Sequence, residues 1–185
     1  MIATADDIIT FWRESGPDAW FTKDDAFDAT IRERFEATWH AARRGELDDW
    51  AETPQGLLAL VLVLDQFSRN LARDSAAAYE SDDEGVRLAC QALERGWIDD
   101  LMRDEATRPV AVFALMPFMH SESIVDQNAG VAAMLRPEWA NNFDFAVVHR
   151  DIIARFGRFA HRNPVLGRRT TPAERDYLES GGFGG

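Results

Sequence analysis

The feature that most constrains the fold is an unbroken apolar run of eight residues at positions 57–64, LLALVLVL. A helix that is apolar around its whole circumference must be buried on every side. The run is far too short to cross a bilayer, which needs about 20 apolar residues. Periodicity alone also allows a buried strand. Thr53 and Pro54 favour a helix, because they suit the N-cap and the first helical position.

The run becomes polar without a break at Asp65, Gln66, Arg69 and Asn70. On a helix Asp65 shares a face with Arg69, and Gln66 shares one with Asn70, because each pair is four residues apart. Buried polar groups need hydrogen-bond partners. We therefore expect the rest of the chain to pack around a helix over 54–70 and to supply partners for its polar end.

Start and stop signals predict about eight helices with short connections and no convincing strand. Capping boxes are expected at Ser81 with Glu84 and at Thr171 with Glu174. The chain should therefore form one all-α domain over 1–185, an antiparallel array of helices. No clean repeat near 34 residues is present, but helix lengths allow stacked hairpins of the tetratricopeptide kind. The helices are predicted at 5–13, 25–44, 54–70, 75–79, 81–95, 107–116, 124–135 and 139–159, with a last short one after Thr171.

The charge distribution bears on the choice of partner. The chain carries a net charge of −12, which argues against a nucleic-acid binder. Residues 145–175 nevertheless hold seven Arg against two acids, Asp151 and Glu174. Arg offers a planar fork that suits carboxylates and phosphates. The alternative is that these Arg pair with the acids of the protein itself.

Cellular location is predicted from the single cysteine and the first residues. Cys90 excludes an internal disulfide and a cysteine-rich zinc site, and we expect it to be a small buried residue. The opening MIATADDIITFW has no basic region followed by an apolar core, which is the pattern of a secretory signal peptide. These features predict a cytoplasmic protein without a membrane partner.

His149 is the most informative of the four histidines. On a single helix through Phe159, it lies at the centre of the apolar stripe and should be buried. A buried His needs a partner, and Asp65 or Glu122 could serve. Gly157 beside the stripe suggests close approach of another helix. Three arginines fall on the opposite side of this helix: Arg155, Arg158 and Arg162.

The polar clusters allow two interpretations. One is a hydrogen-bonded structural core, and the other is a site built from Asp65, Arg69, His120, Glu122 and His149 that acts in acid–base chemistry or binds a metal. The spacing does not favour a metal, because His-x-Glu points to opposite sides of a helix and no His-Glu-x-x-His is present. Gly-rich phosphate loops and a Gly-x-Ser-x-Gly elbow are also missing. We expect neither metal nor cofactor, and a non-enzyme more than an enzyme.

Three blocks resemble the signature blocks of an uncharacterised bacterial family, domain-of-unknown-function family nine-two-four. They are 64–70 (LDQFSRN), 116–122 (MPFMHSE) and 149–163 (HRDIIARFGRFAHRN), supported by Trp20-Phe21 and by 166–174. The resemblance implies an all-helical fold similar to tetratricopeptide repeats and no established activity, substrate or cofactor. Ser68 and Ala160 replace the Pro that is usual in the family, and Met119 replaces a frequent Glu or Leu.

The first functional hypothesis is a non-catalytic helical module that binds a peptide or protein partner. In such arrays a concave groove of Arg and amides can hold an acidic segment or a terminal carboxylate. The candidate polar residues are Asp65, Gln66, Arg69, Asn70, His120, Glu122, His149, Arg150, Arg155, Arg158, His161 and Arg162.

The second hypothesis is a small hydrolase that acts on an anionic substrate. Asp65 or Glu122 would be the base, His120 or His149 its partner, and Arg69 or Arg150 the anion clamp. An open pocket where these side chains converge would favour this hypothesis, and a fully buried network would oppose it.

A third hypothesis is a homodimer that pairs through exposed aromatic residues, with Trp12, Trp50 and Trp139 as candidates.

Overall fold

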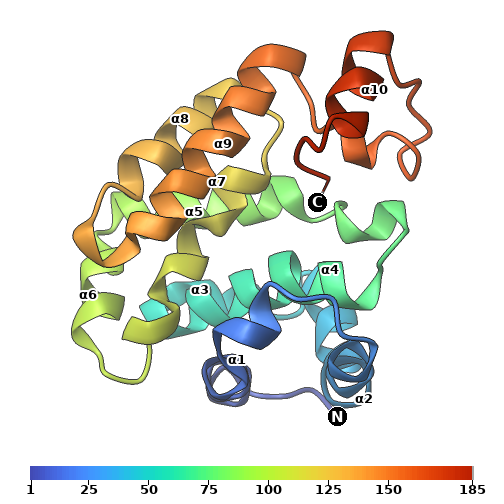
Figure 1. Ribbon diagram of the computed structural model, residues 1–185. Helices are drawn as coiled ribbons and strands as arrows, with labels where there is room; N and C mark the ends of the chain where they lie inside the picture. Colours follow the sequence, from blue (N-terminus) through green and yellow to red (C-terminus); the bar gives the residue numbers. More distant parts are fainter. Residues whose placement is uncertain (185) are drawn as a thin grey trace.

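The computed structural model describes residues 1–184, and every regular element in that range is helical (Figure 1). The all-α prediction is therefore confirmed. The α-helices are α1 (Ala5–Trp20), α2 (Asp25–Arg43), α3 (Pro54–Val61), α4 (Ser68–Leu71), α5 (Asp82–Glu94), α6 (Trp97–Arg103), α7 (Met116–His120), α8 (Ile124–Ala133), α9 (Ala140–Phe156) and α10 (Pro172–Glu179). The 3₁₀ and π segments are η1 (Asp48–Glu52), η2 (Leu62–Phe67), η3 (Ala76–Ala78), η4 (Arg108–Leu115), η5 (Pro137–Trp139) and η6 (Ala160–Arg162).

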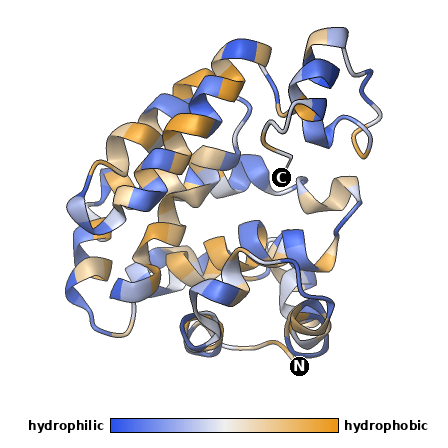
Figure 2. Ribbon diagram, in the orientation of Figure 1, coloured by the Kyte–Doolittle hydropathy of each residue, from blue (hydrophilic) through white to orange (hydrophobic). Residues whose placement is uncertain are grey.

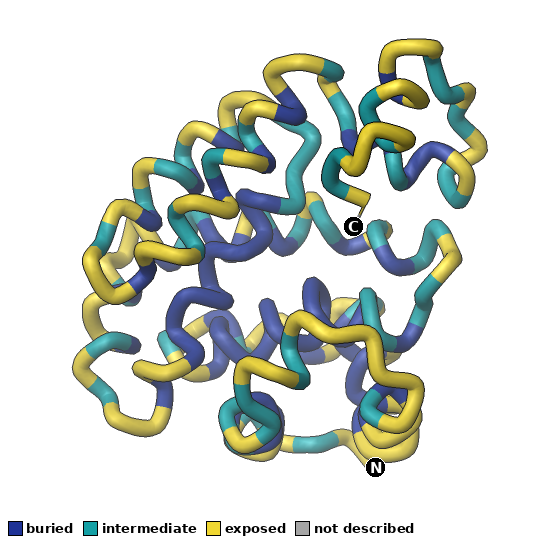
Figure 3. Tube along the Cα trace, in the orientation of Figure 1, coloured by how far each residue is buried: buried dark blue, intermediate teal, exposed yellow. Residues whose placement is uncertain are grey.

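The helices form two groups with the apolar core between them. Figure 1 shows α1 to α4 on one side and α5, α7, α8 and α9 on the other, with α6 joining them at one end. The opposite end carries α10 and the C-terminal tail. Apolar and buried residues concentrate where the groups meet (Figures 2 and 3).

The central helix is the predicted one. Residues 54–71 are continuously helical, with Pro54 in the first turn and the Thr53 hydroxyl accepting a hydrogen bond from the Gly56 amide at 3.1 Å. All eight residues of the apolar run are at most 3 % exposed. The helix contacts α1 and α2 of its own group and α5 of the other group. It is therefore the element on which both groups pack.

A π-helical turn, η2, interrupts this helix at Leu62–Phe67. The Ser68 hydroxyl donates to the Leu64 carbonyl at 2.6 Å, and the Arg69 guanidinium donates to the Asp65 carbonyl at 2.7 Å. Side chains that bond to helix carbonyls in this way disturb the regular ladder. Such π turns occur often at functional sites, and this one contains both Asp65 and Gln66.

The predicted long helix through Phe159 is wrong. α9 ends at Phe156, because Gly157 adopts φ 70° and caps the helix in the left-handed conformation. No atom lies within 4 Å of where a Gly157 Cβ would be, so the predicted close approach of a helix is also wrong. His161 belongs to η6 and not to the helix of His149, and Arg155 and Arg162 do not share one helical face.

The helices differ from the predictions in other places too. α1 continues beyond 13 to Trp20 across a kink at Gly16, which has φ 75°. Ser81 makes no side-chain cap, and Glu84 pairs with an arginine one turn later. The capping box predicted there is therefore wrong, whereas the box at Thr171 is present. α6 has no counterpart among the predicted helices.

The tryptophans suggested for a dimer interface are mostly internal. Trp12 is fully buried and Trp139 is 5 % exposed, so the prediction that they are exposed is wrong. Trp50 is partly buried against the core. Cys90 also packs against the core, but it is only partly buried and not fully buried as predicted. Within residues 1–184, none of the helices is both long enough and apolar enough to cross a membrane.

Two Leu→Ala variants test the central position of this helix. Leu60 is fully buried, whereas Leu135 is 71 % exposed. We expect L60A to lower the free energy of unfolding by about 2–5 kcal/mol, because it leaves a cavity. L135A should change it by about 0.5 kcal/mol or less. Urea denaturation of both variants measures this, and equal losses would contradict the central placement.

Candidate functional site

A cleft of about 450 Å³ opens between the two groups of helices. Many predicted site residues line it, from the central helix, the end of α7, α9 and η6: Gln66, Arg69, Asn70, His120, His149, His161 and Arg162. A separate cleft of about 390 Å³ beside α1 and η1 contains none of the predicted site residues. The cleft between the groups is therefore the candidate site.

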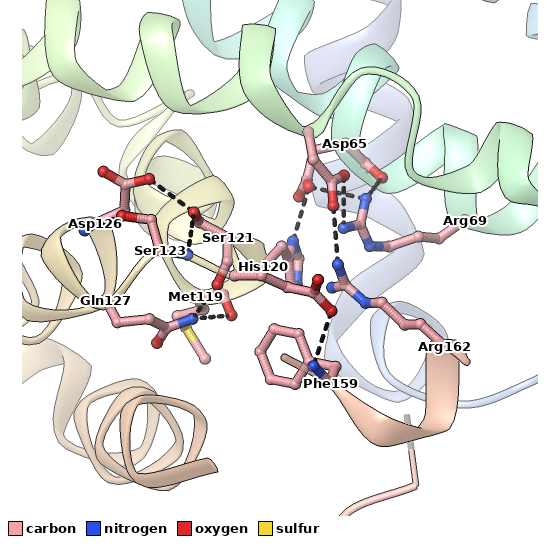
Figure 4. A network of polar contacts seen from close by, with 12 residues as sticks. Asp65, Arg69, Met119, His120, Ser121, Ser123, Asp126, Gln127, Phe159 and Arg162 are labelled. Carbon is pink, nitrogen blue, oxygen red and sulfur yellow. Dashed lines mark hydrogen bonds and ion pairs between the residues drawn. The ribbon is translucent and has the colours of Figure 1, made fainter. Parts of the chain in front are cut away.

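Asp65 lies beneath the cleft and is 1 % exposed. One carboxylate oxygen is 2.7 Å from Nδ1 of His120 and 2.9 Å from Arg69, and the other accepts a hydrogen bond from Gln66 at 2.6 Å (Figure 4). Burial alone raises the pKa of Asp65, but the positive charge of Arg69 and the contacts with His120 and Gln66 outweigh it. The pKa of Asp65 is therefore far below its usual value, and the carboxylate is ionised.

His120 is the partner that fixes the acid–base chemistry of the site. An ionised carboxylate can only accept hydrogen bonds, so Nδ1 of His120 is protonated and donates a hydrogen bond to Asp65. Burial and the neighbouring charge of Arg69 lower the pKa of His120 despite the attraction of Asp65. The ring is therefore neutral at pH 7, and its Nε2 has no hydrogen-bond partner in residues 1–184. An imidazole oriented in this way through Nδ1 can act as a general base through Nε2.

Asp82 links two arginines at the wall of the cleft. One oxygen accepts a hydrogen bond from Arg69 at 3.0 Å, and the other accepts one from Arg162 at 3.1 Å. The Arg162 guanidinium lies between the rings of Tyr79 and Phe159, with its carbon 4.5 Å from each ring centre. The two arginines are therefore held in position before any ligand binds.

Arg162 is incompletely hydrogen-bonded. It is 5 % exposed, and among the described residues Asp82 is the one acceptor that it reaches. Its buried Nε has no partner in that part of the chain. Burial and the like charge of Arg69 lower the pKa of Arg162 more strongly than Asp82 raises it. A guanidinium remains charged despite such a shift, so Arg162 is a buried cation whose hydrogen-bonding capacity is only partly used.

His149 is buried, as predicted, with 6 % of its surface exposed. Its partner is the backbone carbonyl of Phe145, to which Nδ1 donates at 2.7 Å, and not Asp65 or Glu122 as predicted. Burial lowers the pKa of His149, so the ring is neutral. The ring packs 4.5 Å from that of Phe183 and borders the cleft.

Glu122 lies outside the cleft and holds the backbone after α9. It accepts hydrogen bonds from the Phe159 amide at 2.8 Å and from both Nη atoms of Arg168 at 2.6 and 2.9 Å. These contacts lower its pKa although burial raises it. Glu122 therefore fixes the backbone just before η6. The sequence analysis did not predict Arg168 as its partner.

The three remaining arginines predicted for the site do not line the cleft. Arg150 pairs with the neighbouring Asp151 at 2.6 Å. Arg158 binds Glu174 at 2.6 Å, and Arg155 lies over the ring of Phe156 at 4.6 Å. The structure thus divides the predicted arginines into Arg69 and Arg162 at the cleft and three that contact other parts of the protein.

The structure adds lining residues that sequence reasoning missed: Trp20, Phe21, Lys23, Arg73, Tyr79 and Phe183. Trp20 and Phe21 already belonged to the matching blocks, so the resemblance was a usable signal for them. Tyr79 and Phe183 stand alone in the sequence and carry no such signal.

Comparison with known proteins now identifies the family. The profile of a family described as bacterial protein of unknown function, DUF924, matches residues 8–182. The chain belongs to the DUF924 family. It is also similar to the solved structure of a protein of unknown function from Agrobacterium tumefaciens, at 44 % identity and a TM-score of 0.87, over 95 % of this chain and 97 % of that one. No curated protein matches this DUF924 chain.

The cleft makes the stability of this DUF924 protein sensitive to pH. Burial and the charge of Arg162 lower the pKa of His161 to about 4, below the unfolded value of about 6.5. As pH falls below about 6.5, the unfolded chain gains a proton that the folded chain does not, so stability is lost. Between pH 7 and 5 we expect H161Q to lose about 2 kcal/mol less than the parent in urea denaturation. If H161Q and the parent lose the same free energy of unfolding between pH 7 and 5, the buried, positively charged environment of His161 is contradicted.

Proposed function

We propose that the cleft of this DUF924 protein binds a small anionic molecule and that His120 acts on it as a general base, as in a small hydrolase. The observation that carries the proposal is Arg162, a buried guanidinium at the wall of an open cleft with a single carboxylate contact. An unpaired buried donor costs about 1–3 kcal/mol. A bound anion would add acceptors where Arg162 lines the cleft.

The charges around the cleft support an anionic ligand. Lys23, Arg69, Arg73 and Arg162 line it, whereas Asp74 is the one acid among its described lining residues. Three of these cations also pair with acids outside the lining: Arg69 with Asp65 and Asp82, Arg162 with Asp82, and Arg73 with Asp28. Arg69 and Arg162 are also held by Asp82, and such preorganisation reduces the entropy that binding costs.

The geometry of His120 supports hydrolysis by water. In the proposed step, Nε2 takes a proton from a water molecule while the water oxygen forms a bond to the electrophilic carbon or phosphorus of the anion. The bond to the leaving group then breaks, and the imidazolium returns the proton to it. Asp65 stabilises the transient imidazolium, and the arginines stabilise the charge that develops on the substrate.

A peptide partner has less support than a small molecule. That hypothesis depended on Arg155 and Arg158 as well as Arg69 and Arg162, but Arg155 and Arg158 contact aromatic and acidic groups of the protein itself. The cleft, at about 450 Å³, has the size of small-molecule sites, which span about 300–1,000 Å³.

Arg162 and His120 variants test the two parts of the proposal. In isothermal titration calorimetry, R162Q should bind phosphate and small carboxylates at least about tenfold more weakly than the parent, because it removes a charge-assisted contact. H120Q should bind them normally, and its turnover of chromogenic esters that carry a phosphate or carboxylate should fall about a hundredfold.

R150Q is the matched control, because Arg150 pairs with Asp151 away from the cleft. It should behave as the parent in both assays. Equal anion binding by R162Q and the parent would refute the binding site. Unchanged ester turnover in H120Q, or none in the parent, would refute the role of His120.

A further inference from the structure

The lining of the cleft divides into a polar part and an aromatic part. The polar part is the wall with Arg69, His120 and Arg162. The aromatic part comprises Phe21 at the end of α1 and Phe183 in the tail after α10, with Trp20 next to Phe21. A ligand that touched only Arg162 would leave the aromatic part unused.

Phe21 presents a phenyl ring to solvent. It is 64 % exposed although its ring centre lies 6.2 Å from those of Trp20 and Phe113. Those neighbours hold one side of the ring and leave the other open. Ligand pockets are lined largely by apolar and aromatic side chains, and Phe21 is one of those that line this cleft.

Phe183 is held in place on the other side of the cleft. Its amide donates to the Tyr177 hydroxyl at 3.0 Å, and its ring lies 4.5 Å from that of His149 and 5.4 Å from that of His161. Gly182 passes so close to Tyr177 that a Cβ there would lie 2.5 Å from the ring. Figure 1 shows this end of the chain between α10 and α4. The tail therefore forms an ordered wall.

Tyr79 and Phe159, by contrast, already have a partner. Both rings pack against the guanidinium of Arg162, at 4.5 Å each. Phe21 keeps ring surface open to solvent, and Phe183, whose ring packs on His149 and His161, lines the cleft without contacting a cation. Aromatic rings favour other aromatic rings over saturated groups of the same size, because edge and face carry opposite partial charges.

We infer that the ligand is an aromatic anion: a phosphate or carboxylate at Arg162, joined to a flat ring that contacts Phe21 and Phe183. The inference rests on the proposed anion site and deepens it by naming the class of ligand. A volume of about 450 Å³ leaves room for a ring beside the anionic group.

Matched aromatic and saturated probes test this inference. Phenyl phosphate is compared with cyclohexyl phosphate, and benzoate with cyclohexanecarboxylate, so that each pair differs only in the flat ring. In calorimetry, or by quenching of tryptophan fluorescence, we expect the aromatic member of at least one pair to bind about tenfold more tightly. In the double variant F21L/F183L that ratio should fall to about twofold or less, while affinity for inorganic phosphate stays unchanged.

The outcomes separate this inference from the anion site. If both pairs bind with equal affinity in the parent, or the ratio persists in F21L/F183L, the aromatic inference is overturned and the anion site stands. If none of the four probes binds, or R162Q binds them as the parent does, the anion site itself fails.

Discussion

A fully buried carboxylate inside the central helix is the constraint on which this structure depends. Asp65 is 1 % exposed, and a charge at that depth is stable only when it is paired and hydrogen-bonded. Arg69 supplies the charge from the next turn of the same helix, and His120 supplies a hydrogen bond from the end of α7. The neutralisation of Asp65 therefore joins the two groups of helices at the base of the cleft.

The same ion pairs extend from the core to the cleft and give it its chemistry. Arg69 reaches from Asp65 to Asp82, and Asp82 reaches Arg162. Asp65 and Asp82 together balance the charges of Arg69 and Arg162, but the Nε of Arg162 has no hydrogen-bond partner within the described chain. His120, fixed by Asp65, keeps Nε2 free of partners within the described chain. Stability and proposed function thus rest on one network, which links the buried core to the proposed anion site and to His120 beside it.

How far the sequence predicts this arrangement depends on the range of the interactions. Thr53, Pro54 and the apolar run predict the central helix, and the need for partners predicts that other segments hold Asp65 and Arg69. It does not predict that the histidine on Asp65 is His120 and not His149. Local patterns do not predict the π turn at Leu62–Phe67 or the end of α9 at Gly157, because apolar spacing continues past both. Isolated residues such as Tyr79 and Phe183 have no pattern, and tertiary packing alone brings them to the cleft.

The protonation of His120 tests the central claim most directly. Nitrogen-15 NMR of the imidazole distinguishes the two neutral tautomers from the imidazolium. We predict a neutral ring at pH 7, with the proton on Nδ1 toward Asp65 and an unprotonated Nε2, because an ionised Asp65 accepts a hydrogen bond from that N–H. A proton on Nε2 at pH 7, in either the other tautomer or the imidazolium, would contradict it.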